Sequence, residues 1–172
     1  MRSSHISGVM LAALAAVGLS STPLKADTAK TFVTDAIQAD VSEVKLGRLA
    51  EKNGGSEAVR AFGRTIDVDR TKTGEDAIGT AIALGLEPPA QPEPEGEAEY
   101  RRLSTMSGAA FDREFLRYIV KSRQADVRRF EAEANANDGN ASAMARQQLP
   151  VLRRHLATAQ ALQKAHDQES SQ

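Results

Sequence analysis

The sequence of 172 residues contains no cysteine and no tryptophan. Without thiols the chain cannot form a disulfide scaffold, a thiolate zinc site, a cysteine nucleophile or a cysteine-held iron–sulfur cluster. It has only three histidines, and its formal net charge of -1 gives no overall electrostatic reason to expect nucleic acid as a partner. The length is sufficient for one medium-sized domain that is stabilised by its own apolar core.

The first 26 residues have the features of a secretory signal peptide. Arg2 provides a positive start, and an apolar run over residues 9–19 is followed by polar residues before Ala26. This run is shorter than the roughly 20 apolar residues that a membrane helix needs, and no later stretch reaches that length. We predict cleavage after Ala26, with a cut near Ser20 or an uncleaved anchor as alternatives. The remaining residues, 27–172, are then expected in the periplasm, without a transmembrane segment.

Apolar residues in this remaining part recur at spacings of three and four, which is typical of amphipathic helices. The pattern predicts four long helices and one short one, over residues 27–53, 56–84, 97–103, 109–135 and 141–166. Gly54, Gly55 and Gly85 are the residue type that ends helices. No segment shows the alternation of a strand, so the predicted fold class is all-α, a four-helix bundle that forms one domain over residues 27–172.

Residues 87–99 are predicted to form the one long connection of this bundle. Four of the six prolines (Pro88, Pro89, Pro92 and Pro94) lie here among acidic residues, a composition that favours an extended spacer. A spacer of this length can carry the chain from one end of the bundle to the other. A further proline, Pro150, is expected to kink or break the last helix.

Each predicted apolar stripe also carries an ionisable residue near its middle. At about 100° per residue, Glu43, Arg70, Arg123 and His155, on four different helices, all point toward one region. Arginine stays protonated at physiological pH, so acids must neutralise it if it is buried. We therefore predict a buried ion network of Glu43, Asp69, Arg70, Arg123, Asp126, Glu131 and His155.

Two other interpretations of these residues are open. Their side chains can reach the edge of the bundle and remain hydrated. Alternatively, Glu43, Asp126, Glu131 and His155 can bind a metal, because carboxylates and histidines on facing helices build two-metal sites in bundles. The Glu-x-x-His motif of such sites is absent, and two arginines share the region. We therefore expect no metal and no cofactor.

Several blocks of the sequence resemble, in order, the ferritin-like family known as domain of unknown function 4142. They are Ser42–Ala50 (SEVKLGRLA), Phe62–Arg70 (FGRTIDVDR), Ser107-Gly108 followed by Phe111-Asp112, and Leu149–Leu156 (LPVLRRHL). The resemblance implies an exported bacterial envelope protein with a ferritin-like four-helix bundle and no established catalytic activity. The family pattern has Asp-His on the second and third helices, whereas this chain has Asp69-Arg70 and Ser122-Arg123.

The two arginine positions share a local pattern. Phe62, Arg64, Ile66 and Arg70 recur as Phe115, Arg117, Ile119 and Arg123. The repeat indicates either equivalent positions on facing helices or only the shared periodicity of two amphipathic helices.

A basic stripe lies opposite the apolar face of the helix over residues 109–135. It consists of Arg113, Arg117, Lys121 and Arg128. Such a stripe can bind phosphates of lipid head groups or lipopolysaccharide, and the scarcity of aromatic residues argues against nucleic acid. The alternative is an ordinary hydrated face that is paired with neighbouring acids.

These observations predict a non-enzymatic periplasmic bundle that acts through its surface, with a role in envelope stress tolerance. Its partner would be an unknown protein or an anionic envelope component, and no nucleic acid is expected. The alternative function is that of a divergent ferritin-like metal-binding or redox protein that uses Glu43 and His155.

Overall fold

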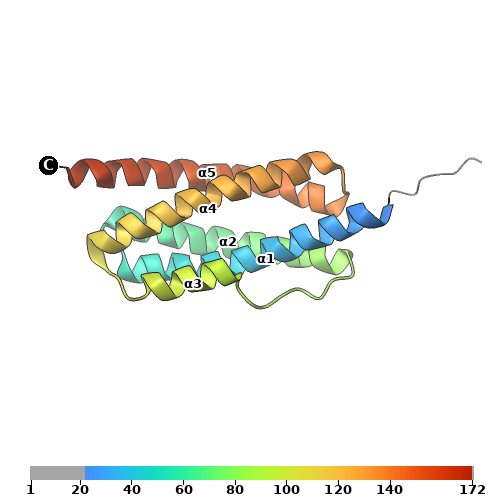
Figure 1. The fold of residues 1–172 in the computed structure, drawn as a ribbon, viewed down its shortest axis with the longest axis horizontal. Helices are drawn as coiled ribbons and strands as arrows, with labels where there is room; N and C mark the ends of the chain where they lie inside the picture. The colour runs from blue at the N-terminus through green and yellow to red at the C-terminus, as the bar shows by residue number, and fades with distance from the viewer. Residues whose placement is uncertain (1–21, 172) are drawn as a thin grey trace, which may run out of the picture.

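The computed structural model describes residues 22–171, which are helical over most of their length (Figure 1). The helices are α1 (Thr22–Asn53), α2 (Glu57–Ala83), α3 (Pro94–Leu103), α4 (Gly108–Ala136) and α5 (Asn140–Glu169). Within these residues the only β-type pairing is an isolated bridge between Gly54 and Gly108. The predicted all-α fold class is confirmed.

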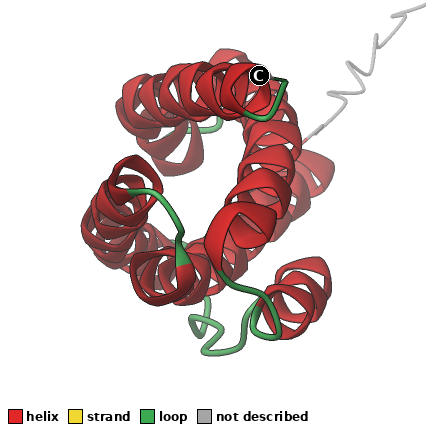
Figure 2. Ribbon diagram, turned by 90° about the vertical axis from the view of Figure 1, so that its left-hand side faces the viewer, coloured by secondary structure: helices red, strands yellow, loops and turns green. Residues whose placement is uncertain are grey.

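Two antiparallel hairpins make up the bundle. The first consists of α1 and α2, the second of α4 and α5, and the two hairpins pack along their lengths (Figure 1). Seen end on, the four long helices surround one axis, and α3 lies outside them (Figure 2). The predicted four-helix bundle is therefore present, with α3 as an outer fifth helix that packs mainly against α1.

The helix boundaries differ from the predicted ones mainly at the two ends of the chain. Helix α1 begins at Thr22, five residues before the predicted start, and α5 continues to Glu169. Pro150 does not end α5, which is one helix from Asn140 onward. Most of the predicted signal peptide falls on residues 1–21, outside the described residues, so it stays a prediction. None of the helices from residue 22 onward has an apolar stretch that could span a bilayer.

The long connection between the two hairpins is shorter than predicted. Helix α2 ends where Gly85 adopts a φ of 70°, and the Leu86 backbone N–H donates to the Ala81 carbonyl at 2.9 Å. The non-helical connection covers residues 84–93. The predicted spacer over 87–99 is therefore wrong at its C-terminal end, because its last six residues are helical. Pro94 is the first residue of α3, a position where proline suits the helix because its missing N–H is not needed there.

Helix α3 is fixed on α1 by backbone contacts. The Glu93 N–H reaches the Ser42 hydroxyl at 3.0 Å and the Gln38 carbonyl at 3.3 Å. A Cβ on Gly96 would lie only 2.5 Å from the Ser42 hydroxyl oxygen, so the two helices touch where glycine leaves room. Lys45 adds an ion pair with Glu97.

Glycines also allow α1 and α2 to approach closely. A Cβ on Gly47 would lie 2.7 Å from the carbonyl oxygen of Gly63, and a Cβ on Gly63 would lie 2.6 Å from that of Gly47. Both distances are shorter than any ordinary contact to a carbon atom. The backbones of the first hairpin are therefore in direct contact at this level.

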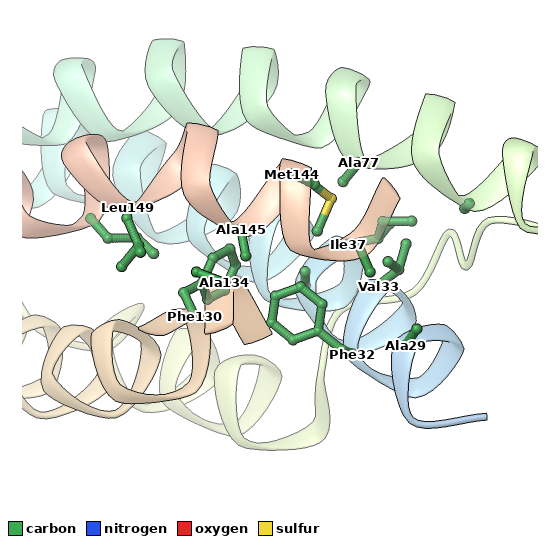
Figure 3. Packing of buried hydrophobic residues seen from close by; sticks show 14 residues of the cluster. Ala29, Phe32, Val33, Ile37, Ala77, Phe130, Ala134, Met144, Ala145 and Leu149 are labelled. Carbon is green, nitrogen blue, oxygen red and sulfur yellow. The ribbon is translucent and has the colours of Figure 1, made fainter. Parts of the chain in front are cut away.

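The apolar core has two parts. One lies at the end of the bundle where α1 begins, and there Phe32 and Phe130 pack edge to face with ring centroids 4.8 Å apart (Figure 3). The other lies toward the opposite end and is centred on Phe62, Phe111 and Phe115. The residues between the two parts, at mid-height, are polar or charged.

The Gly63 contact generates a stability prediction. Gly63→Ala should lower the free energy of unfolding by about 1–3 kcal/mol, because the new methyl group collides with backbone atoms of α1. Gly79→Ala in the same helix is the matched control. A Cβ there meets nothing within 4 Å, so the change should raise stability by about 0.5–1 kcal/mol. Urea unfolding followed by circular dichroism measures both, and equal midpoints would contradict the close approach.

Candidate functional site

Ionisable side chains from all four long helices meet between the two apolar clusters. Asp40 and Glu43 come from α1, Arg70 from α2, Arg123 from α4 and His155 from α5. Each of these side chains is at most 4% exposed. We call this set, together with Asp126 and the hydrogen-bonded Thr73 and Gln148, the charge layer.

Glu43 is the centre of the charge layer. Arg123 donates from Nη1 and Nη2 to its two carboxylate oxygens, and Arg70 Nε lies 2.6 Å from Oε2. Burial by itself raises the pKa of Glu43, but Arg123 and Arg70 outweigh that effect and hold this pKa below its usual value. Glu43 is thus ionised and links α1 to both α2 and α4.

Two further carboxylates surround the guanidinium groups. Asp40 accepts from Arg70 Nη1 at 3.0 Å and from the Thr73 hydroxyl at 3.3 Å, and burial raises its pKa to about 6. Asp126 accepts from Arg123 Nη1 at 3.1 Å, and burial followed by the charge of Glu43 raises its pKa. Three acids therefore share two buried arginines.

His155 is the member contributed by the last helix. Its Nε2 lies 2.7 Å from Asp69 Oδ2, and burial, followed by the charges of Arg123 and Arg70, lowers its pKa to about 4. The imidazole is consequently neutral at pH 7. A carboxylate only accepts hydrogen bonds, so Nε2 carries the proton and Nδ1 is an acceptor. Helix α5 makes a second polar contact with α2, because Gln148 Nε2 donates to the Thr73 carbonyl at 3.1 Å.

The structure brings together most of the predicted ion network. Glu43, Arg70, Arg123, Asp126 and His155 all lie in the charge layer. Asp69 lies at its rim, with a side chain that is 27% exposed and that also pairs with Arg154 at 3.3 Å.

The prediction is wrong for Glu131. Its side chain is 43% exposed and pairs with Arg153 on α5 at 2.7 Å. It follows Asp126 by five residues, which places it about 140° around the helix and away from the layer.

Three members of the charge layer were missed from the sequence: Asp40, Thr73 and Gln148. Asp40 precedes Glu43 by three residues and so shares its helical stripe, a signal that could have found it. Gln148 lies two helical turns before His155 and offers the same kind of signal. Thr73 follows Arg70 by three residues and so shares its helical stripe, but the signal is weaker because threonine also occurs in helices without any polar role.

The residues of the alternative metal site do not form a ligand cluster. Glu43 and Asp126 are both bound by Arg123, and Glu131 is on the surface. Within the described residues no three His, Asp or Glu side chains are grouped so as to hold a metal ion. The guanidinium groups stand beside the carboxylates that would have to be ligands, so this donor set does not fit a metal centre.

The predicted basic stripe lies on the outer face of α4, where acids oppose most of it. Arg113 and Arg117 pair with Glu114 at 3.5 and 2.5 Å, and Lys121 pairs with Glu95 of α3 at 3.0 Å. These three basic side chains are between 58% and 77% exposed. The stripe is therefore accessible and partly neutralised, and its fourth member, Arg128, is also exposed.

The Phe111-Asp112 motif has a structural explanation. Asp112, which is buried, accepts from the backbone N–H groups of Gly55 and Ser56, each at 2.8 Å. These groups precede the first turn of α2, where unpaired N–H donors require acceptors. Asp112 therefore ties the turn of the first hairpin to the beginning of the second.

The comparisons with known proteins agree with this architecture. The sequence profile described as Domain of unknown function (DUF4142) matches residues 14–162, most of the chain. The chain belongs to this family. No curated protein matches the sequence.

A solved structure with a similar fold is described as the crystal structure of a DUF305 fragment from Deinococcus radiodurans. It shares 20% sequence identity with this DUF4142 protein, with a TM-score of 0.70. The match covers 84% of this chain and 97% of that one. At this identity the likeness concerns the helical fold alone.

Removing an arginine tests the energetics of the charge layer. Arg123→Ala should lower the free energy of unfolding by about 3–5 kcal/mol, because it leaves Glu43 buried without its bidentate partner. Arg128→Ala, at an exposed position of the same helix, is the control and should change stability by less than about 0.5 kcal/mol. Urea melts measure both. Equal midpoints for wild type and Arg123→Ala would contradict a structural role for the pair.

The pKa values in the charge layer predict how stability depends on pH. The pKa of Asp40 rises on folding to about 6. Its contribution to the free energy of unfolding is therefore complete below about pH 4 and is lost as pH rises through 6. The pKa of His155 falls to about 4, so its contribution is present above about pH 6.5 and is lost as pH falls through 4. The two effects oppose each other between pH 4 and 6.5.

Variants at these positions separate the two effects. Asp40→Asn removes the group whose protonation stabilises the folded state in acid. The free energy of unfolding should therefore fall more steeply on acidification than in the wild type. His155→Gln should make the fall shallower. The change in slope for each is at most about 1.4 kcal/mol per pH unit, the value for one proton. Urea melts at half-unit steps measure the slopes, and parallel curves for all three proteins would refute these protonation states.

Proposed function

We propose that this DUF4142 protein is a non-enzymatic envelope protein, exported to the periplasm, that acts through its surface. The charge layer is the observation that carries the proposal. Its carboxylates face guanidinium groups, and His155 is neutral and turned toward Asp69. These groups pair with one another in the interior, and the side chains of Asp40, Glu43, Arg70, Arg123 and His155 are at most 4% exposed. We therefore assign these groups a structural role, in which their ion pairs and hydrogen bonds link the four helices.

We assign the surface contacts to the outer face of α4 and the adjoining part of α3. Five basic side chains (Arg102, Arg113, Arg117, Lys121 and Arg128) meet three acidic ones there (Glu95, Glu99 and Glu114). The excess of positive charge favours phosphate groups, such as those of anionic lipid head groups and lipopolysaccharide. A role in envelope stress tolerance belongs to the same proposal and rests on the predicted export.

Vesicle binding tests the assigned face. The purified protein should cosediment with vesicles of phosphatidylglycerol and phosphatidylethanolamine at low salt and dissociate as salt screens the charges. Changing Arg113, Arg117, Lys121 and Arg128 together to Gln should weaken binding by about tenfold or more. The matched control changes four exposed basic residues elsewhere (Lys52, Lys72, Arg153 and Lys164) to Gln and has the same net charge.

The outcomes separate the alternatives. Equal loss in both quadruple variants would show that only net charge matters, and the absence of wild-type binding to anionic vesicles, including vesicles with lipopolysaccharide, would refute the assigned face. Elemental analysis of protein purified without chelators tests the proposal that the charge layer is structural and holds no metal centre. Iron or manganese near one or two ions per chain would contradict a purely structural interior.

A further inference from the structure

The charge layer contains buried polar atoms that have no hydrogen-bond partner among the described residues. Three belong to acceptor groups: Asp40 Oδ2, Gln148 Oε1 and His155 Nδ1. Three are donors, Arg70 Nη2, Arg123 Nε and Arg70 Nε, of which the last has the Glu43 carboxylate as an ion-pair partner at 2.6 Å. All five residues are at most 3% exposed, so bulk water does not satisfy them. A buried polar group without a partner costs about 1–3 kcal/mol, and native proteins rarely leave several together.

The donor and acceptor roles are fixed by the contacts already described. Gln148 uses its amide nitrogen on the Thr73 carbonyl, so the other amide atom is the oxygen. His155 uses Nε2–H on Asp69, so Nδ1 carries only a lone pair. Arginine can only donate. The unpaired atoms are therefore a mixture of the two kinds.

This mixture discriminates between small ligands. A metal cation would satisfy the acceptors but would be repelled by the guanidinium groups. A halide or other simple anion would satisfy the arginine donors but cannot donate to Asp40, Gln148 or His155. A water molecule both donates and accepts, and buried waters typically make about three hydrogen bonds to such groups.

Four of the five side chains form one connected set, and His155 lies within electrostatic range of Arg70, Arg123 and Glu43. Arg70 binds both Asp40 and Glu43, and Glu43 binds Arg123. Gln148 joins this set through Thr73, whose hydroxyl donates to Asp40. The unpaired atoms thus come from α1, α2, α4 and α5 at one level of the bundle.

We propose that the charge layer is a hydration site, in which ordered internal water molecules bridge the arginine donors to Asp40, Gln148 and His155. The waters would connect the two hairpins at the level where apolar packing is interrupted. They would also let three carboxylates share two buried arginines, because each bridging water supplies donors that the side chains lack.

High-resolution crystallography of the protein, with crystals grown without halide, tests the site directly. We expect at least one ordered water within hydrogen-bond distance of Arg70 Nη2 or Arg123 Nε and of one of the three acceptors. Oxygen-17 relaxation dispersion in solution should in addition detect internal water that exchanges more slowly than surface water.

A matched pair of variants localises the water. Gln148→Met keeps the shape of the side chain and removes the acceptor, together with the amide donor to the Thr73 carbonyl, so the relaxation signal should fall by the contribution of at least one molecule. Gln147→Met, at the exposed neighbouring position, should leave it unchanged. His155→Phe provides a second test that removes a different acceptor.

Two results would overturn the proposal. One is a dry layer, in which the arginine donors and the acceptors pair directly with each other. The other is an anomalous peak beside Arg70 and Arg123 in crystals soaked in bromide, which would make the ligand an anion. Equal relaxation signals in wild type, Gln148→Met and His155→Phe would also contradict water at this site.

Discussion

The burial of Glu43 between two arginines is the interaction on which the rest of this structure depends. A carboxylate removed from water costs several kcal/mol unless its partners are placed with good geometry. Arg123 reaches it from α4 with two donors, and Arg70 reaches it from α2. Because each of these residues is on a different helix, the three helices must be aligned along the bundle axis at the same time.

The apolar clusters on either side do not impose this alignment. Contacts among aliphatic and aromatic side chains are non-directional, and a helix can be shifted along its neighbour with only a moderate loss of packing. The charge layer is directional, since a shift of one turn would move Arg123 by about 5.4 Å and leave Glu43 unpaired. The glycine contact between Gly47 and Gly63 adds a second constraint, because the absence of side chains there lets the backbones of α1 and α2 touch.

The arginines also decide the chemistry of the interior. At the two positions where the family pattern described above has histidine, this DUF4142 protein has Arg70 and Arg123. A histidine is able to lose its proton and bind a metal, whereas a guanidinium remains charged and only donates. The carboxylates that could serve as ligands are consequently held in ion pairs, and His155 is neutral beside them.

The local pattern of the sequence was sufficient for the helices and for much of the charge layer. Periodicity identified five helices, and it placed Glu43, Arg70, Arg123 and His155 on inward stripes, because one helical turn determines which residues share a face. The repeated pattern around Arg70 and Arg123 marks equivalent positions, since both arginines bind Glu43 and the rings of Phe62 and Phe115 are in contact.

Periodicity could not identify partners on other helices. Asp126 lies in the layer while Glu131 faces Arg153, and the partners of Thr73 and Gln148 depend on how the two hairpins dock. The same holds for Asp112, which caps a turn more than fifty residues earlier in the chain. The sequence by itself thus determined which side of each helix is buried, because that property is local. Only the tertiary structure decided which buried charges meet, because ion pairing depends on the relative rotation and height of helices that are far apart in sequence.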